Sequence, residues 1–237
     1  MAKKEETTDV AIPENDQALV AGADIFDKND NMLGIDLQIS QIKIIHQGQM
    51  FGFPEDVKKL SFKGTIVDIS RTNAYWAKSF DDSGGGEAPT CSSLDGINPE
   101  MDSEEVQASS CFGCERNKFG SDGKRGKQCK NMKRIHVLVD GEKIPYRLTV
   151  PPSNLKAIDI YVSSLTSKGI PYPLAETEFK LKSVKNKDGI EYSELIMRNV
   201  GGTPLVKNRE EAQALKRMID SCRGSMRGKR IVDNEAE

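Results

Sequence analysis

The chain has 237 residues, which is enough for one large domain or two small domains with a buried core. Charged residues make up 30% of the chain and hydrophobic residues 37%, and the formal net charge is -2. No apolar run approaches the roughly 20 residues of a membrane-spanning helix. These values exclude a helical membrane protein and predict a soluble protein with an ordinary core and attached polar segments.

The small net charge hides two basic segments. Residues 115–134 contain eight Lys or Arg against two acidic residues, and residues 207–230 contain eight against three. The rest of the chain is therefore acidic. An anionic partner is expected to meet the chain at these two segments.

The N-terminal residues 1–32 are rich in Glu, Asp, Lys and Asn and show no sustained hydrophobic periodicity. This composition predicts a flexible arm. No apolar stretch of the kind found in signal peptides follows Met1, so we expect a reducing, cytoplasmic location. The ordered domain is predicted to span residues 33–205, with an insertion at 84–133.

Before the insertion, β-branched and alternating apolar residues predict strands at 39–46, 59–70 and 73–80. Gly64 lies inside the second of these strands, at a point where small barrels commonly bend or bulge. The run Ser-Gly-Gly-Gly at 83–86 then ends the sheet and leads into the insertion.

Four of the five cysteines lie in the insertion, at Cys91, Cys111, Cys114 and Cys129, with 19, 2 and 14 residues between them. Two residues between Cys111 and Cys114 let both thiolates reach one ion from a single turn. The other two cysteines would complete a shell of four sulfur ligands. This spacing predicts one structural Zn²⁺, because four cysteines leave no open position for catalysis.

Two alternatives to zinc remain at this point. Disulfides are disfavoured by the expected reducing compartment. Unrelated buried cysteines are disfavoured because the surrounding residues are mainly Ser, Gly, Asn and Asp, which do not form a hydrophobic core.

The elements expected after the insertion are strands at 133–139 and 144–150, a helix at 153–168 with Ser153 as its N-cap, and strands at 175–182 and 190–200. Pro145 is expected to place the second of these strands at a sheet edge. The order of elements is typical of an OB-type barrel, in which one sheet face and its loops bind oligonucleotides. The predicted fold is mainly β (β-rich α+β), an OB-like barrel with an inserted zinc-binding loop and a C-terminal helix.

The last segment, residues 206–237, is predicted to form that helix and a basic tail with acidic residues at its end. The sequence N-R-E-E at 208–211 resembles a capping box. One face of the helix would present Ala212, Leu215, Ile219 and Cys222. Cys222 is therefore interpreted as a small buried residue and not as a metal ligand.

Binding of single strands without base readout requires cations for the backbone and aromatic faces for the bases. The candidate stacking residues are Tyr75, Trp76, Phe119, Tyr146 and Tyr172. The candidate phosphate contacts are Lys63, Arg71, Lys124, Arg125, Lys127, Lys133, Arg134 and Arg147. A sole tryptophan is at least as often a core anchor, and some lysines could instead neutralise a zinc–thiolate cluster.

Four segments also resemble a known family. They are, in chain order, C-S-S-L-D-G-I-N-P, C-F-G-C-E-R-N-K-F-G-S, G-K-R-G-K-Q-C-K-N-M-K-R and I-P-Y-R-L-T-V-P-P-S-N-L-K. With these segments, over roughly residues 74–200, the chain resembles single-stranded-DNA-binding proteins of tailed bacteriophages and prophages. The resemblance implies an OB-fold with a four-cysteine zinc loop, acting in phage DNA replication or recombination in the host bacterial cytoplasm.

We do not expect an enzyme or a small-molecule substrate. Gly120 and Gly126 have five residues between them instead of the four of a phosphate-binding loop, and Gln128 follows Lys127 where Ser or Thr is needed. The expected partner is single-stranded DNA, with replication or recombination proteins as further candidates and no membrane. The main alternative is a zinc-ribbon transcription or replication accessory factor that binds protein or duplex DNA. A third possibility is a structural zinc domain in a phage assembly.

Overall fold

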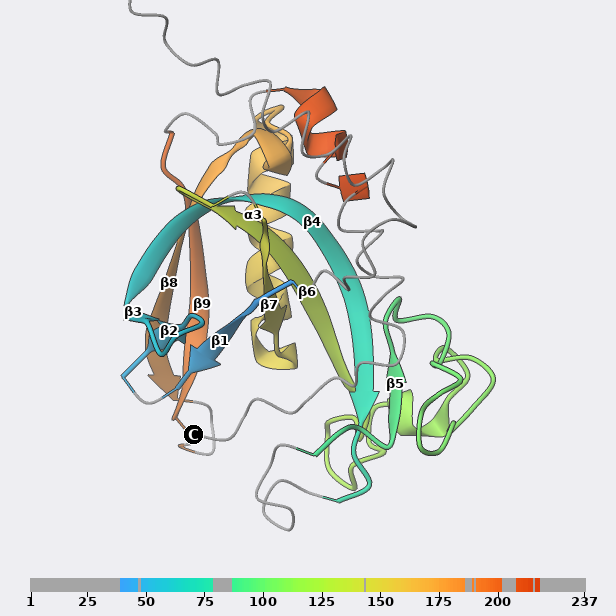
Figure 1. The fold of residues 1–237 in the computed structure, drawn as a ribbon. Coiled ribbons are helices and arrows are strands. Elements are labelled where there is room, and N and C mark those ends of the chain that lie inside the picture. The colour runs from blue at the N-terminus through green and yellow to red at the C-terminus, as the bar shows by residue number, and fades with distance from the viewer. Residues whose placement is uncertain are drawn as a thin grey trace, which may run out of the picture.

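The computed structural model describes residues 39–46, 48–78, 87–142, 144–185, 189, 191–201, 208–214 and 216–217. The predicted N-terminal arm and most of the predicted tail lie outside these residues. Within them the fold is mainly β, as the sequence predicts (Figure 1). No helix in this described part is long and apolar enough to cross a membrane.

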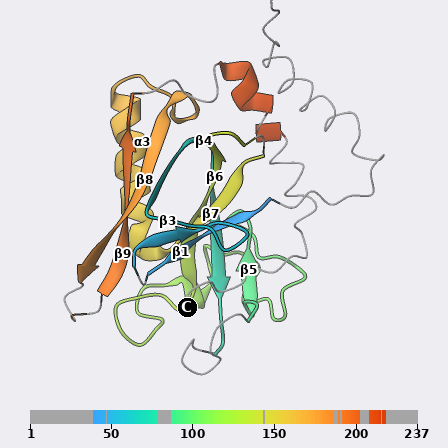
Figure 2. The same cartoon turned by 60° about the vertical axis from the view of Figure 1, so that its left-hand side comes forward.

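One curled sheet forms the body of the molecule (Figures 1 and 2). Its strands are β1 Gln41–Ile45, β2 Met50–Gly52, β3 Lys58–Lys59, β4 Ser61–Tyr75, β5 Cys91–Ser93, β6 Lys130–Val139, β7 Tyr146–Val150, β8 Glu176–Lys185 and β9 Glu191–Asn199. They lie in the order β3-β2-β1-β7-β6-β4-β8-β9, with β5 paired to β4. All neighbours are antiparallel except β1 and β7, which are parallel.

Helix α3, Leu155–Ser167, lies between β7 and β8 in the chain and packs against the sheet. The structure also describes three short 3-10 turns, η1 Glu115–Asn117, η2 Pro152–Asn154 and η3 Tyr172–Leu174. The buried core includes Ile42, Phe51, Phe62, Ile66, Ile135, Val137, Leu148, Val150, Ile158, Leu165, Phe179 and Leu195. The alternation predicted for 175–182 is confirmed in β8, where Thr177 and Phe179 are buried between more exposed neighbours.

Strand β4 replaces two predicted strands. Most of the segment predicted at 59–70 and the first part of the segment predicted at 73–80 form one strand of 15 residues, Ser61–Tyr75, because no glycine or proline separates them. Residues 76–78 are not in a strand, and residues 79–80 lie outside the described residues. Its first part pairs with β8, its length with β6 and its end with β5. The bulge lies between Ile66 and Asp68, and not at Gly64 as expected.

Gly64 instead permits a close approach of β4 to β6. A Cβ atom at this position would lie 2.6 Å from the backbone oxygen of Leu138 and 2.7 Å from Cγ1 of Val137. We expect Gly64→Ala to lower the free energy of unfolding by about 1–3 kcal/mol, because a paired backbone cannot move away. Urea denaturation measures this, with Gly113→Ala as the control, since a methyl group there meets nothing within 4 Å. Equal stability of the two variants would contradict the tight approach.

Strand β6 is buried on both faces, although its sequence predicts one apolar face and one polar face. Ile135 and Val137 contact the core, and Arg134 and His136 on the opposite face are 6% and 1% exposed. The opposite face is therefore covered as well, which the alternation of residues in β6 does not reveal.

Part of this cover comes from η3 and from helical residues near the C-terminus. Residues 209–214 and 216–217 are helical, and the Lys216 Nζ lies 3.1 Å from Oδ1 of Asp68 on β4. His136 Nδ1 lies 3.5 Å from the other oxygen of Asp68. Burial raises the pKa of Tyr172 in η3, and the nearby Asp68 carboxylate adds to that shift. Of the predicted helix face, Leu215, Ile219 and Cys222 lie outside the described residues.

Strand β7 is not an edge strand, contrary to the expectation from Pro145. It pairs with β6 on one side and with β1 on the other, where Gln41 lies opposite Arg147. Pro145 precedes the strand directly, so its missing N–H falls outside the ladder.

Side chains from other parts of the fold bind the edge of β9 that does not pair with β8. Asn154, which is 1% exposed, donates from Nδ2 to the Ser193 carbonyl and accepts from the Leu195 N–H, both at 2.9 Å. The Ser193 N–H also donates to Nδ1 of His46, 3.4 Å away. Asn154 is the residue that precedes α3, one position after the Ser153 that we predicted as N-cap.

Candidate metal centre and nucleic-acid interface

The cysteine loop, residues 87–129, is anchored on two neighbouring strands. At its start, β5 pairs with the end of β4, where Cys91 lies opposite Tyr75. At its end, Cys129 directly precedes β6. The loop therefore projects from one end of the sheet, beside the last residues of β4 (Figure 1).

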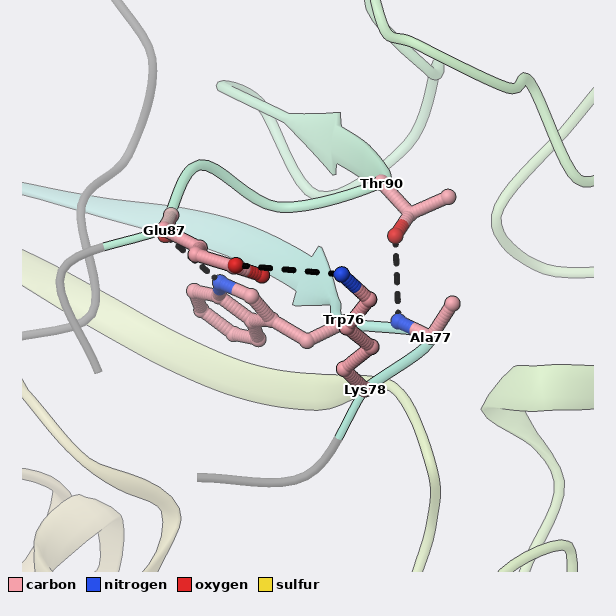
Figure 3. A network of polar contacts seen from close by, with 5 residues as sticks. All are labelled: Trp76, Ala77, Lys78, Glu87 and Thr90. Carbon is pink, nitrogen blue, oxygen red and sulfur yellow. Dashed lines mark hydrogen bonds and ion pairs between the residues drawn. The ribbon is translucent and has the colours of Figure 1, made fainter. Parts of the chain in front are cut away.

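Three contacts hold the first residues of the loop against the chain that follows β4 (Figure 3). The indole Nε1 of Trp76 donates to the Glu87 carbonyl at 3.0 Å, and the Ala77 N–H donates to Oγ1 of Thr90 at 3.0 Å. Lys78 and Glu87 form an ion pair at 3.9 Å. The tryptophan thus helps to position the loop.

The four predicted metal ligands lie around one cavity. Cys91, Cys111, Cys114 and Cys129 all line it, and its volume of about 20 Å³ is enough for one water-sized particle. All four are free thiols; Cys114 and Cys129 are buried and the other two are half-buried. The fold therefore gathers cysteines that are up to 38 residues apart in the chain.

These thiols affect one another electrostatically. Burial, followed by the neighbouring Cys111, Cys114 and Cys91, raises the pKa of the Cys129 thiol to about 12. Burial also raises the pKa of Cys91. Within the described residues, no group of three or more Cys, His, Asp or Glu side chains has the arrangement of a coordination shell. The four cysteines thus line one cavity, and burial favours the neutral thiol at Cys91 and Cys129.

Polar side chains hold the loop in place of an apolar core. The Asn131 Nδ2 donates to Asn73 on β4 and to Asn117 in η1, both at 2.9 Å. Lys127 Nζ donates to Asn131 at 2.7 Å and to Asn117 at 3.2 Å. Asn117 in turn donates to the Cys111 carbonyl at 2.8 Å. The network connects both strands to the Cys-x-x-Cys turn.

The five candidate stacking residues differ in exposure. Tyr75 is buried, with the Arg116 guanidinium 5.1 Å from its ring centroid. Trp76, Tyr146 and Tyr172 are half-buried. Phe119 is 82% exposed. Phe119 is therefore the candidate whose ring is most open to a base.

The strand register places the basic candidates on two faces. Ile69 lies opposite Ile135 of the core, and two residues further Arg71 lies opposite Lys133, so both cations are on the core-side face. Lys63 follows the buried Phe62 and lies on the other face. Lys63 and Arg71, eight residues apart, would share a face without the bulge.

Several candidate cations already have partners inside the protein. Lys133 pairs with Asp159 of α3, and Lys127 belongs to the asparagine network and lies 4.7 Å from the Phe119 ring centroid. Arg134 is buried, and Arg147 donates to Gln41 at 3.3 Å, with its pKa lowered by burial. The exposed candidates are Lys63, Arg71, Lys124 and Arg125.

Sequence reasoning missed the asparagine network, the position of Arg116 over Tyr75, and Phe112. Asn73 and Asn131 are 58 residues apart and meet only through strand pairing. Phe112 is 96% exposed. Its place inside Cys-Phe-Gly-Cys is a usable signal, because side chains between two cysteines that face one site point away from that site.

Comparisons of the chain with protein-family models, with curated proteins and with solved structures find no match.

Proposed function

We propose that this chain is a single-stranded-DNA-binding protein built on an OB-type barrel. The elements β4, β6, β7, α3, β8 and β9 supply five strands with a helix between the third and the fourth. Strand β4 pairs with both β6 and β8, which joins the two parts of a curled sheet. This arrangement supports the OB-type assignment.

The position of the cysteine loop is the main support for the function. The loop joins β4 to β6, the first and second strands of this barrel. In OB-folds that connection, together with the one between the last two strands, binds oligonucleotides. Here it exposes Phe119 with Lys124 and Arg125 close by in the chain, which combines a stacking ring with backbone charge.

We further propose that Cys91, Cys111, Cys114 and Cys129 hold one structural Zn²⁺. All four are free thiols around one small cavity, and the loop that bears them contains little apolar core. Zinc supplies order to such a segment when bound. Because the bound sulfurs must be thiolates and burial keeps Cys129 protonated, metal uptake should release protons.

The biological setting is part of the proposal and follows the resemblance noted for residues 74–200. Single strands become exposed during phage DNA replication and recombination, and a protein that binds them needs no catalytic group. Contacts to the phosphate backbone and stacking on aromatic rings are possible with every base, so little sequence preference is expected.

Equilibrium binding to labelled oligonucleotides tests the function directly. We expect the full chain to bind mixed-sequence and homopolymeric DNA single strands with similar affinity, and to bind duplexes of equal length more weakly. A preference for duplex DNA would favour the zinc-ribbon accessory factor. Binding to none of these would overturn the proposed function. Single-stranded RNA in the same assay measures the preference between DNA and RNA.

Charge and stacking should separate in mutants of the loop. The salt dependence is the slope of the logarithm of the binding constant against the logarithm of the salt concentration. Replacing Lys124 and Arg125 by glutamine is expected to lower the magnitude of this slope by up to about 1.4, at roughly 0.7 per lost phosphate contact. Phe119→Ala is expected to cost roughly 1–3 kcal/mol with an unchanged slope, because stacking releases no counterions. Titrations at several salt concentrations measure both. An unchanged slope in the charge variant would show that Lys124 and Arg125 do not contact phosphates.

The two faces of β4 supply a matched pair of variants. Arg71 lies on the core-side face near the loop residue Gly96. A Cβ atom added at Gly96 would lie 2.8 Å from the Cβ of Arg71. Lys63 is also exposed on the same strand but lies on the other face. We expect Arg71→Gln to reduce the salt slope by up to about 0.7 and Lys63→Gln to leave it unchanged. The reverse result would place the DNA on the opposite face.

A further inference from the structure

The cysteine loop and the start of β6 have two halves of opposite charge. Residues 87–114 contain six acidic residues and no Lys or Arg, whereas residues 115–134 contain eight Lys or Arg and two acidic residues. The formal charges are therefore -6 and +6. Only the second half suits a nucleic acid, because the first would repel it.

The acidic half also exposes large apolar side chains. Phe112 is 96% exposed, Met101 85% and Ile97 60%. The Cys111 N–H donates to the Ile97 carbonyl at 2.8 Å, so the backbones that bear Ile97 and Phe112 lie side by side. Apolar side chains grouped within a polar rim are typical of a protein-binding surface.

Three carboxylates close to Met101 in the chain are exposed and available to a partner. Asp102, Glu104 and Glu105 are exposed, and no Lys or Arg within the described part of the chain pairs with them. A matching partner would present an apolar side chain among cations. The basic half of the same loop has this composition, with Phe119 82% exposed and with Lys124 and Arg125 exposed near it in the chain.

We propose that the acidic half of the loop docks onto the basic half of a second copy of this chain. The two halves are opposite in sign and equal in magnitude of formal charge, and each exposes a phenylalanine. Because both halves belong to one loop, a two-fold symmetric dimer forms the contact twice. Complementary charges of this kind favour association and fix the orientation of the partners.

The dimer would use the residues that the proposed function assigns to DNA, and to that extent the inference rests on the proposed function. Phe119, Lys124 and Arg125 cannot contact a base and backbone while they contact a second copy. Single-stranded DNA therefore competes with the dimer and releases monomers, each bound to the strand.

Sedimentation equilibrium of the full chain tests the dimer without DNA. We expect a dimer at low salt that dissociates as salt rises, because screening weakens contacts between exposed charges. Reversing Glu104 and Glu105 to lysine should raise the dimer dissociation constant by about tenfold or more. Asp140→Lys, at an exposed turn after β6, should leave it unchanged. A chain that remains monomeric at low salt would overturn the proposal.

A charge-swap experiment tests the pairing itself. Lys124→Glu with Arg125→Glu should also abolish the homodimer, and mixing this variant with the Glu104→Lys, Glu105→Lys variant should restore association, because opposite charges meet again. Failure of the mixture to associate would contradict the contact.

Titrating the wild-type dimer with an oligonucleotide should give monomer–DNA complexes. If DNA binds and the dimer persists, the docking site is elsewhere; if DNA does not bind, the proposed function fails and the dimer result stands.

Discussion

If the proposed zinc is present, joint replacement of Cys111 and Cys114 by serine is expected to remove it and to unfold the cysteine loop while the sheet remains folded. Structural zinc contributes on the order of 10 kcal/mol of binding free energy in small zinc domains. The loop has little apolar burial to replace that contribution, since Phe112 and Phe119 are exposed. The proposed DNA affinity should be lost with it.

Hydrogen exchange distinguishes unfolding of the loop from unfolding of the sheet in this experiment. The Cys129 N–H donates to the Arg116 carbonyl at 2.9 Å, and the Gly120 N–H donates to Gly126 at 2.7 Å; both should lose protection. Amides of β6 should keep theirs. Elemental analysis should find one zinc per wild-type chain and one per Cys222→Ser control. Wild-type protein purified under reducing conditions without stoichiometric metal would falsify the zinc site.

Asn154→Ala is expected to lower the free energy of unfolding by about 2–6 kcal/mol. The amide makes hydrogen bonds to the backbone of Ser193 and Leu195 in a site that is 1% exposed. Removing it leaves a buried carbonyl and a buried N–H unsatisfied, at about 1–3 kcal/mol for each group. For a domain of this size the Tm should fall by roughly 5–15 °C.

Asn154→Asp provides a sharper comparison at the same site. An aspartate can still accept from the Leu195 N–H but places an oxygen against the Ser193 carbonyl in place of a donor. We expect it to be at least as destabilising as alanine, because a buried charge adds its own cost. Thermal unfolding followed by circular dichroism gives both values. If the free energy of unfolding falls by less than about 1 kcal/mol in both variants, β9 is held mainly by its pairing with β8.

The sequence predicted the elements whose signals are local. The alternation predicted for 175–182 and the helix predicted at 153–168 depend on neighbouring residues, and the structure has both, as β8 and α3. The four cysteines around one cavity follow from their spacing and from the short turn between Cys111 and Cys114.

The remaining features depend on distant partners. The bulge between Ile66 and Asp68 is defined by the pairing of β4 with β6, and it changes the face on which Arg71 lies. Arg134 is buried because other elements cover the second face of β6. The period of a strand predicts which residues share a face only where the pairing is regular.

The two ends of the sheet have a consequence for how densely the protein can be packed. Strand β3 is only two residues long, and both are exposed lysines, while β9 has backbone groups of Ser193 and Leu195 occupied by Asn154 and His46. Neither edge therefore offers a long row of unpaired N–H and C=O groups to a neighbouring chain. In the proposed function, many copies could lie side by side along one strand of DNA without their sheet edges pairing into intermolecular β-aggregates.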